Sequence, residues 1–157
     1  MKALNATIKY FLIFVVGAMF ILTTLQVIMR YGFNNALSWS EELVRFLFVW
    51  ATLLGAAIGI KEHIHIGIDT VVNLLPATLR RYTNTLVHLI DIAFFIFLIV
   101  MGWSFVEMTH TQFSPAMDIR MSHVHLAIPL GGGLCILYSV LEIINTWKKS
   151  KLPGEGG

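Results

Sequence analysis

The sequence predicts an all-α integral membrane protein with four transmembrane helices, because its composition is strongly apolar and four long apolar segments follow one another along the chain. Hydrophobic residues make up 57% of the 157 residues, charged residues make up 13%, and the mean hydropathy is +0.76. Soluble domains carry about 25% charged residues. Too few polar side chains are present to cover a surface in contact with water, so the expected solvent is lipid.

Four segments have the length that a transmembrane helix needs, which is about 20 mostly apolar residues. The first segment exceeds the apolar core of a typical signal peptide, about 7–15 residues, and we interpret it as an uncleaved span. The helices form a single membrane domain over residues 1–157, with a short disordered tail at 152–157. The expected spans are residues 10–29, 40–60, 82–108 and 124–147.

A shorter segment at 62–75 separates the second and third spans. Its apolar residues fall on one face of a helix, its polar residues fall on the other, and Pro76 ends the pattern. Because the segment is too short to cross a bilayer, we predict an amphipathic helix that lies at the membrane interface. Ile64, Ile66 and Ile68 also alternate with polar or small residues, which leaves an extended segment as the alternative.

The distribution of Lys and Arg predicts that both termini lie in the cytoplasm, since basic residues are enriched in cytoplasmic loops. Eight of the eleven basic residues fall on one side of the four spans and three fall on the other, where two outer loops are expected at roughly 30–39 and 109–123. The eight are Lys2, Lys9, Lys61, Arg80, Arg81, Lys148, Lys149 and Lys151, and the three are Arg30, Arg45 and Arg120.

The start of the second span carries several polar signals. Ser38 and Glu41 match a capping box, in which the hydroxyl and the carboxylate satisfy free backbone N–H groups of the first turn. The negative charges of Glu41 and Glu42 are favourable at the N-terminus of a helix, which is the positive end of the helix dipole. Arg45 follows Glu41 at the spacing of an i, i+4 ion pair. Trp39 suits the aromatic belt at the membrane surface. These charges could pair with a partner protein, or they could simply begin an ordinary capped helix.

The third span carries a polar stripe, because Asn84, His88 and Asp91 share one helical face. A carboxylate inside the membrane is costly unless it is paired, and the spacing allows His88 to hydrogen-bond with Asp91. A relay for protons or ions is one interpretation of the stripe. We favour a satisfied polar patch that faces another helix or a partner subunit, because residues 92–101 are uniformly apolar and would interrupt a relay.

The sequence lacks the patterns of the main chemical classes. A net charge of +2 without a basic run argues against nucleic-acid binding. No Ser/His/Asp set, phosphate loop or nucleotide fingerprint is visible, so we predict that the chain is not an enzyme. The single cysteine, Cys135, excludes a CxxC-type metal or redox site. We therefore assign no catalytic, cofactor-binding or metal-binding residue.

Six histidines leave one alternative, a haem-bearing membrane anchor of a respiratory enzyme. Two axial ligands should come from different helices at matching depth. His88 belongs to the inner half of the third span, whereas His123 and His125 belong to the outer end of the fourth, and His63 and His65 lie near the inner surface. No matched pair emerges from these positions.

The fourth span opens with Pro129 and three glycines at 131–133. Proline suits the first turn of a helix or a kink. Glycines remove side-chain bulk and let a neighbouring helix approach closely. We predict that these residues serve packing and not chemistry.

Short motifs run in a specific order through nearly the whole chain, roughly residues 8–148. They are VIMRY at 27–31, WSEEL at 39–43, Trp50, LGAA at 54–57, EHI at 62–64 with Asp69, LP at 75–76, SPA at 114–116 and IPLG at 128–131. Together with the four-span layout, they resemble the small membrane subunit of tripartite ATP-independent periplasmic (TRAP) transporters. The chain is similar to the stand-alone form of that subunit, which is not fused to the large one.

The resemblance implies a function and three partners. The small subunit would pack on a large membrane subunit and enlarge its static scaffold, against which the substrate-bearing domain moves like an elevator. A periplasmic binding protein would supply an organic acid, such as sialic acid or a C4-dicarboxylate, and a sodium gradient would drive its import across the bacterial inner membrane. Substrate and sodium sites belong to the large subunit, so the small subunit needs no cofactor and meets only the two proteins and membrane lipid.

The polar residues described above become candidate contacts in this setting. Candidates for the large subunit are Arg30, Trp39, Glu41, Glu42, Arg45, Asn84, His88 and Asp91. Candidates for the binding protein, which would meet the second outer loop, are Ser114, Asp118 and Arg120.

Overall fold

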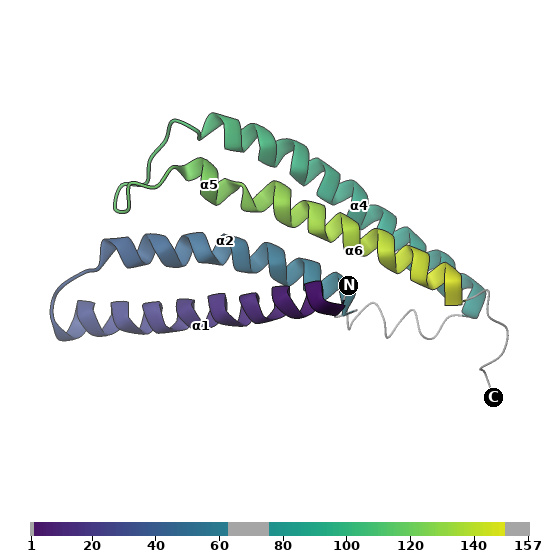
Figure 1. The fold of residues 1–157 in the computed structure, drawn as a ribbon, viewed down its shortest axis with the longest axis horizontal. Coiled ribbons are helices and arrows are strands. Elements are labelled where there is room, and N and C mark those ends of the chain that lie inside the picture. The colour runs from purple at the N-terminus through teal and green to yellow at the C-terminus, as the bar shows by residue number, and fades with distance from the viewer. Residues whose placement is uncertain (1, 63–75, 150–157) are drawn as a thin grey trace.

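The computed structural model describes residues 2–62 and 76–149 as a row of long helices (Figure 1). The helices are α1 (Lys2–Gly32), α2 (Ser38–Lys61), α4 (Ala77–Met108), the short α5 (Met121–His125) and α6 (Ala127–Lys149).

Four stretches of the described residues are long and apolar enough to cross a membrane. They are Asn5–Gly32, Ser38–Lys61, Tyr82–Met108 and Met121–Lys148, the last of which includes both α5 and α6. The predicted all-α membrane fold with four spans is therefore confirmed. The predicted interfacial helix at 62–75, apart from Glu62 at its start, and the tail at 152–157 lie outside the described residues.

The helices form two antiparallel hairpins that pack against each other. Helix α1 packs on α2, α2 packs on α6, and α6 packs on α4, so that α2 and α6 occupy the middle of the row. Helices α1 and α4 begin, and α2 and α6 end, at one end of the row (Figure 1), which we call the terminal end. We call the opposite end, which carries the turn at 33–37 and the loop at 109–120, the loop end.

Two glycines of α6 allow this helix to pack closely on both of its neighbours. A Cβ atom added at Gly131 would lie 2.5 Å from Cβ of Leu53 in α2. A Cβ atom added at Gly132 would lie 2.9 Å from Cγ1 of Ile99 in α4, whereas Gly133 faces open space. The predicted packing role is thus confirmed for two of the three glycines, because a larger side chain there would push the helices apart.

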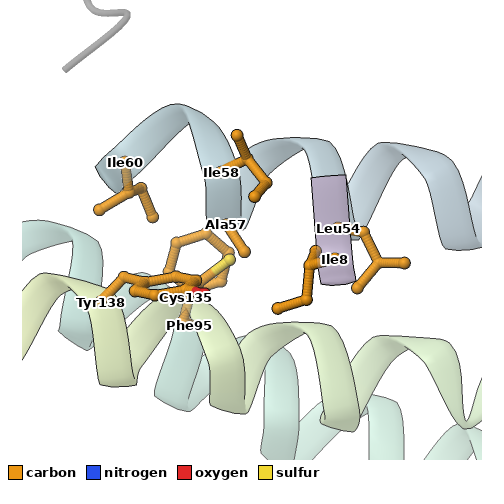
Figure 2. Packing of buried hydrophobic residues seen from close by; sticks show 8 residues of the cluster. All are labelled: Ile8, Leu54, Ala57, Ile58, Ile60, Phe95, Cys135 and Tyr138. Carbon is orange, nitrogen blue, oxygen red and sulfur yellow. The ribbon is translucent and has the colours of Figure 1, made fainter. Parts of the chain in front are cut away.

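The apolar core lies in the terminal half of the row, where three helix interfaces meet (Figure 2). Ala57 of α2 and Cys135 of α6 are completely buried, with Phe95 of α4 beside them. The hydroxyl of the buried Tyr138 donates a 2.7 Å hydrogen bond to Oδ1 of Asn5 in α1. This bond joins α6 to α1 across the end of the row and satisfies a polar group that would otherwise be buried without a partner.

The outward faces of α1 and α4 remain apolar and exposed. Among them, Phe14 and Phe20 of α1 expose more than 70% of their surface, and Phe97 of α4 exposes 59%. Such faces are unfavourable in water, but they suit contact with lipid tails or with helices of another membrane protein. The two outer helices of the row, α1 and α4, therefore both present surfaces suited to the interior of a membrane.

The predicted capping box at the start of α2 is wrong. Helix α2 begins at Ser38 itself, Leu37 is the N-cap residue, and no side chain caps the first turn. Because Ser38 already lies inside the helix, its hydroxyl is not in the capping position. Ser40 instead donates a 2.8 Å hydrogen bond from its hydroxyl to the carbonyl oxygen of Leu37.

Candidate partner-binding site at the loop end

The loop at 109–120 folds into a small, hydrogen-bonded hairpin. Ser114 donates a 2.9 Å backbone hydrogen bond to Ile119, and Asp118 donates one of 3.0 Å to Ser114. Phe113 and Arg120 form an isolated antiparallel bridge, and the Arg120 guanidinium lies 5.7 Å from the centre of the Phe113 ring. Asp118 closes the turn with φ at 53°, a left-handed conformation that Asp and Asn tolerate better than most residues.

Glu42 connects this hairpin to α2. Its carboxylate oxygen Oε2 accepts hydrogen bonds from the hydroxyl of Ser114 and from the backbone N–H of Ala116, the latter at 3.2 Å. The Ser114 hydroxyl also accepts a 3.4 Å bond from the N–H of Met117, and the side chain is 3% exposed. Hydrogen bonds to an ionised carboxylate are stronger than neutral ones. The carboxylate therefore fixes the position of a loop that lies more than 70 residues away in sequence.

A second polar contact closes the base of the loop. The hydroxyl of the buried Thr109 lies 2.9 Å from Nδ1 of His125 in α5. The His125 ring packs on Phe105 of α4, with 4.4 Å between ring centres. The contact between Thr109 and His125 joins α4 to α5, and the Glu42 contact joins the loop between them to α2.

Around the anchored hairpin, the remaining candidate residues of the loop end are exposed. Glu41 and Arg45 form the predicted i, i+4 ion pair at 3.2 Å, and both side chains are about two-thirds exposed. Trp39, Asp118 and Arg120 are exposed as well. The predicted ion pair is thus confirmed, and the loop end offers charges of both signs to a partner.

Glu42 and Ser114 are candidates for contact with two different partners, the large subunit and the binding protein, and these contacts stay predictions. In the structure they bind each other, so these side chains organise the surface from within the chain. Neither their pairing nor the contact between Thr109 and His125 carries a recognisable sequence signal, because the residues of each pair lie far apart in the chain.

The polar stripe of the third span lies apart from this site, in the terminal half of α4. His88 is 6% exposed and packs within the chain, and its Nδ1 atom lies 3.5 Å from Oδ2 of Asp91. Asn84 is half-buried one turn away. The two side chains are therefore close, but no hydrogen bond joins these two atoms, so the predicted hydrogen bond between His88 and Asp91 is not formed through them. Their role in contact with the large subunit stays a prediction, and His88 is covered by this chain itself.

The described residues contain no group of three or more His, Cys, Asp and Glu side chains that could hold a metal ion. His88 and His125 lie at opposite ends of the row, in the terminal half and at the loop end.

Comparison with known proteins decides the family. Residues 19–149 match the family described as tripartite ATP-independent periplasmic transporters, DctQ component. The chain belongs to this family. It is a small permease subunit of a TRAP transporter, a multi-pass protein of the inner membrane and a transporter component rather than an enzyme. This confirms the resemblance and argues against the haem-bearing respiratory anchor.

Three relatives illustrate the range of this similarity. The small TRAP permease is 42% identical over 100 residues to a C4-dicarboxylate TRAP transporter small permease protein, DctQ, of Vibrio cholerae. The match includes 63% of this chain but only 43% of that relative.

A putative TRAP transporter small permease protein of Haemophilus influenzae is 28% identical over 91% of this chain and 89% of its own length. The sialic acid TRAP transporter permease protein SiaT of H. influenzae is 38% identical over 46% of this chain, which corresponds to 12% of that longer protein. The small subunit thus resembles part of a larger permease protein, as expected for a family whose members work with a large permease.

Proposed function

We propose that this chain is the small scaffold subunit of a sodium-coupled TRAP transporter that imports an organic acid. It packs on the large permease subunit and enlarges the static part of the transporter, against which the substrate-bearing domain moves like an elevator. The substrate class is sialic acid or a C4-dicarboxylate, because the names of relatives in V. cholerae and H. influenzae carry these two substrates.

The observation that carries the scaffold role is the contact between Glu42 and the hairpin at 109–120. One carboxylate holds both the Ser114 hydroxyl and the Ala116 N–H, and Thr109 with His125 closes the base of the same loop. A surface that is fixed before a partner arrives loses little conformational entropy on binding. Such a surface suits a static subunit.

The interior of the row supports the assignment of substrate transfer to the large subunit. Among the described residues, four buried polar side chains lie near the loop end, and two others, His88 and Ser139, lie in the terminal half. The apolar stretch at 92–101 of α4 separates the two groups. A carboxylate substrate needs donors along its path, and sodium needs oxygen ligands, so we place both sites on the large subunit.

Charge supports an orientation with both termini in the cytoplasm. Lys9, Lys61, Arg80 and Lys148 lie at the terminal end, whereas Arg30, Arg45 and Arg120 lie at the loop end. The bias follows the enrichment of basic residues in cytoplasmic segments. The loop end then faces the periplasm, where Asp118 and Arg120 are available to the binding protein.

Purification of the tagged chain from native membranes tests the scaffold role. We expect a large polytopic subunit to co-purify in a one-to-one ratio, identified by mass spectrometry. A chain that emerges alone, or together with a redox enzyme, would contradict the proposal.

Reversal of two charges tests the contact with the binding protein. Exchange of the signs through Asp118→Arg and Arg120→Asp leaves the net charge unchanged, and we expect it to lower substrate uptake while the large subunit still co-purifies. Asp118→Asn is the matched control, because Asn also tolerates the left-handed backbone found at this position. Unchanged uptake in the double variant would remove this surface from the proposal.

A further inference from the structure

We propose that the terminal end carries a binding site for one anionic phospholipid, formed by the last two turns of α6 and the start of α4. An apolar groove receives an acyl chain, and Lys148 and Arg80 bind the phosphate-bearing headgroup. This site lies at the opposite end of the row from the surface proposed for the binding protein.

The apolar part of the site is a groove along the last two turns of α6. It has a volume of about 330 Å³, and among the described residues Ile143, Ile144, Trp147 and Lys148 line it. Trp147 is held in place because its indole N–H donates a 3.2 Å hydrogen bond to the hydroxyl of Thr85 in α4. This bond joins the two helices beside the groove and orients a rigid apolar ring along it. Tryptophan at this depth is typical of the interface between lipid tails and headgroups.

The charged part of the site follows from the ends of the two helices. Lys148 borders the groove at the end of α6, and Arg80 lies at the start of α4. Each is next to a second basic residue in the sequence, Lys149 and Arg81, while residues 77–90 and 143–149 contain no Asp or Glu. In the described part of the chain, no ion pair neutralises Lys148 or Arg80. The side chains of Lys148 and Arg80 together match the chemistry of an anionic headgroup.

A second groove of the same chain provides a comparison, because it is apolar but has no basic residue among the described residues that line it. It has a volume of about 400 Å³ and lies between α4 and α6 nearer the loop end, where Gly102, Phe105 and Ile128 line it. Its described lining contains no Lys or Arg. That groove can accept an acyl chain but offers nothing to a phosphate, so the two grooves differ in the one feature that selects a headgroup.

Lys9, at the same end of the row, provides a further contrast. Its ammonium group lies 2.8 Å from the carboxylate of Glu62 at the end of α2. This cation is already neutralised, whereas the cations beside the groove are not. Lys61, at the end of α2, lies 5.7 Å from the centre of the Tyr138 ring, so among these cations it is Lys148 that borders the groove.

Native mass spectrometry of the full chain, purified in uncharged detergent together with its accompanying subunits, tests the site. Phosphatidylglycerol and phosphatidylcholine with identical acyl chains are the probes. We expect one phosphatidylglycerol to bind more tightly than phosphatidylcholine. We expect Arg80→Gln with Lys148→Gln to weaken phosphatidylglycerol binding about fivefold per cation removed, and to leave phosphatidylcholine binding unchanged.

Arg30→Gln with Arg45→Gln is the matched control, because it removes the same charge at the loop end. Ile144→Trp is a second variant that fills the groove but keeps both cations, and we expect it to weaken binding of both lipids. The proposal is overturned if the unaltered chain binds both lipids equally. Equal losses in the two double variants, or undiminished binding in Ile144→Trp, would also overturn it.

Discussion

The two ends of the helix row are stabilised by different interactions, apolar packing at the terminal end and hydrogen bonds at the loop end. At the terminal end, Ala57, Phe95, Cys135 and other apolar side chains form a buried core, to which Tyr138 adds one hydrogen bond. At the loop end, a carboxylate holds a hairpin through directed hydrogen bonds. Packing tolerates exchanges among apolar residues of similar volume, whereas the Glu42 contact depends on one chemical group. The terminal end thus provides stability, and the loop end provides a defined surface.

The largest effect is expected at the close contact between α6 and α2. Gly131→Ala would place a Cβ atom 2.5 Å from Cβ of Leu53, and overpacking of this kind costs about 1–3 kcal/mol. Gly133→Ala makes the same change where a Cβ atom meets open space. We expect a lower midpoint of thermal unfolding for Gly131→Ala and an unchanged midpoint for Gly133→Ala, with unfolding of the purified chain monitored by size-exclusion chromatography. Equal midpoints would mean that close packing does not hold the row together.

The next effect is expected at the loop end. Glu42→Ala leaves the Ala116 N–H and the Ser114 hydroxyl without their acceptor, which costs about 1–2 kcal/mol when such groups lose a charged partner. We expect faster amide hydrogen exchange at 114–117 with little change in the terminal half. Glu41→Ala removes an exposed carboxylate one residue away and should leave exchange in the hairpin unchanged. Protection that survives in Glu42→Ala would show that the carboxylate does not fix the loop.

The sequence predicts features with a local pattern better than contacts between distant residues. Apolar spans, the glycines at 131 and 132, and the i, i+4 pair of Glu41 and Arg45 all follow from local periodicity, and the structure confirms them. The contact between Glu42 and Ser114 joins residues 72 positions apart, so no local pattern reveals it. The capping box was not formed because the N-cap residue is Leu37, one residue before the Ser38 that the motif requires. A shift of one residue at a helix start changes which side chain can cap the helix, and local sequence does not fix the start that closely.

A smaller effect is expected where α6 meets α1. Tyr138→Phe removes the hydrogen bond to Asn5, and bonds between helices in membrane proteins contribute about 0.6 kcal/mol on average. A double-mutant cycle with Asn5→Ala isolates the coupling from the other effects of each change. Unfolding in detergent should give a small positive coupling energy. Additive effects would show that apolar packing alone positions α1.

The smallest effect is expected for the exposed pair of Glu41 and Arg45. Ion pairs of this kind on a helix surface contribute less than about 0.5 kcal/mol. Glu41→Gln should therefore leave thermal unfolding nearly unchanged, and added salt should remove what difference there is. A large destabilisation would indicate that the pair supports more of the loop end than its exposure suggests.

A distance measurement across the loop end tests the scaffold role most directly. Spin labels at Ser38→Cys and Gln112→Cys report on the separation of α2 from the hairpin, and the buried Cys135 should remain unlabelled. In the assembled transporter, pulsed electron paramagnetic resonance should give one narrow distance distribution that is the same with and without substrate and sodium. A second population, or a shift when substrate and sodium are added, would show that this subunit moves during transport and would contradict a static scaffold.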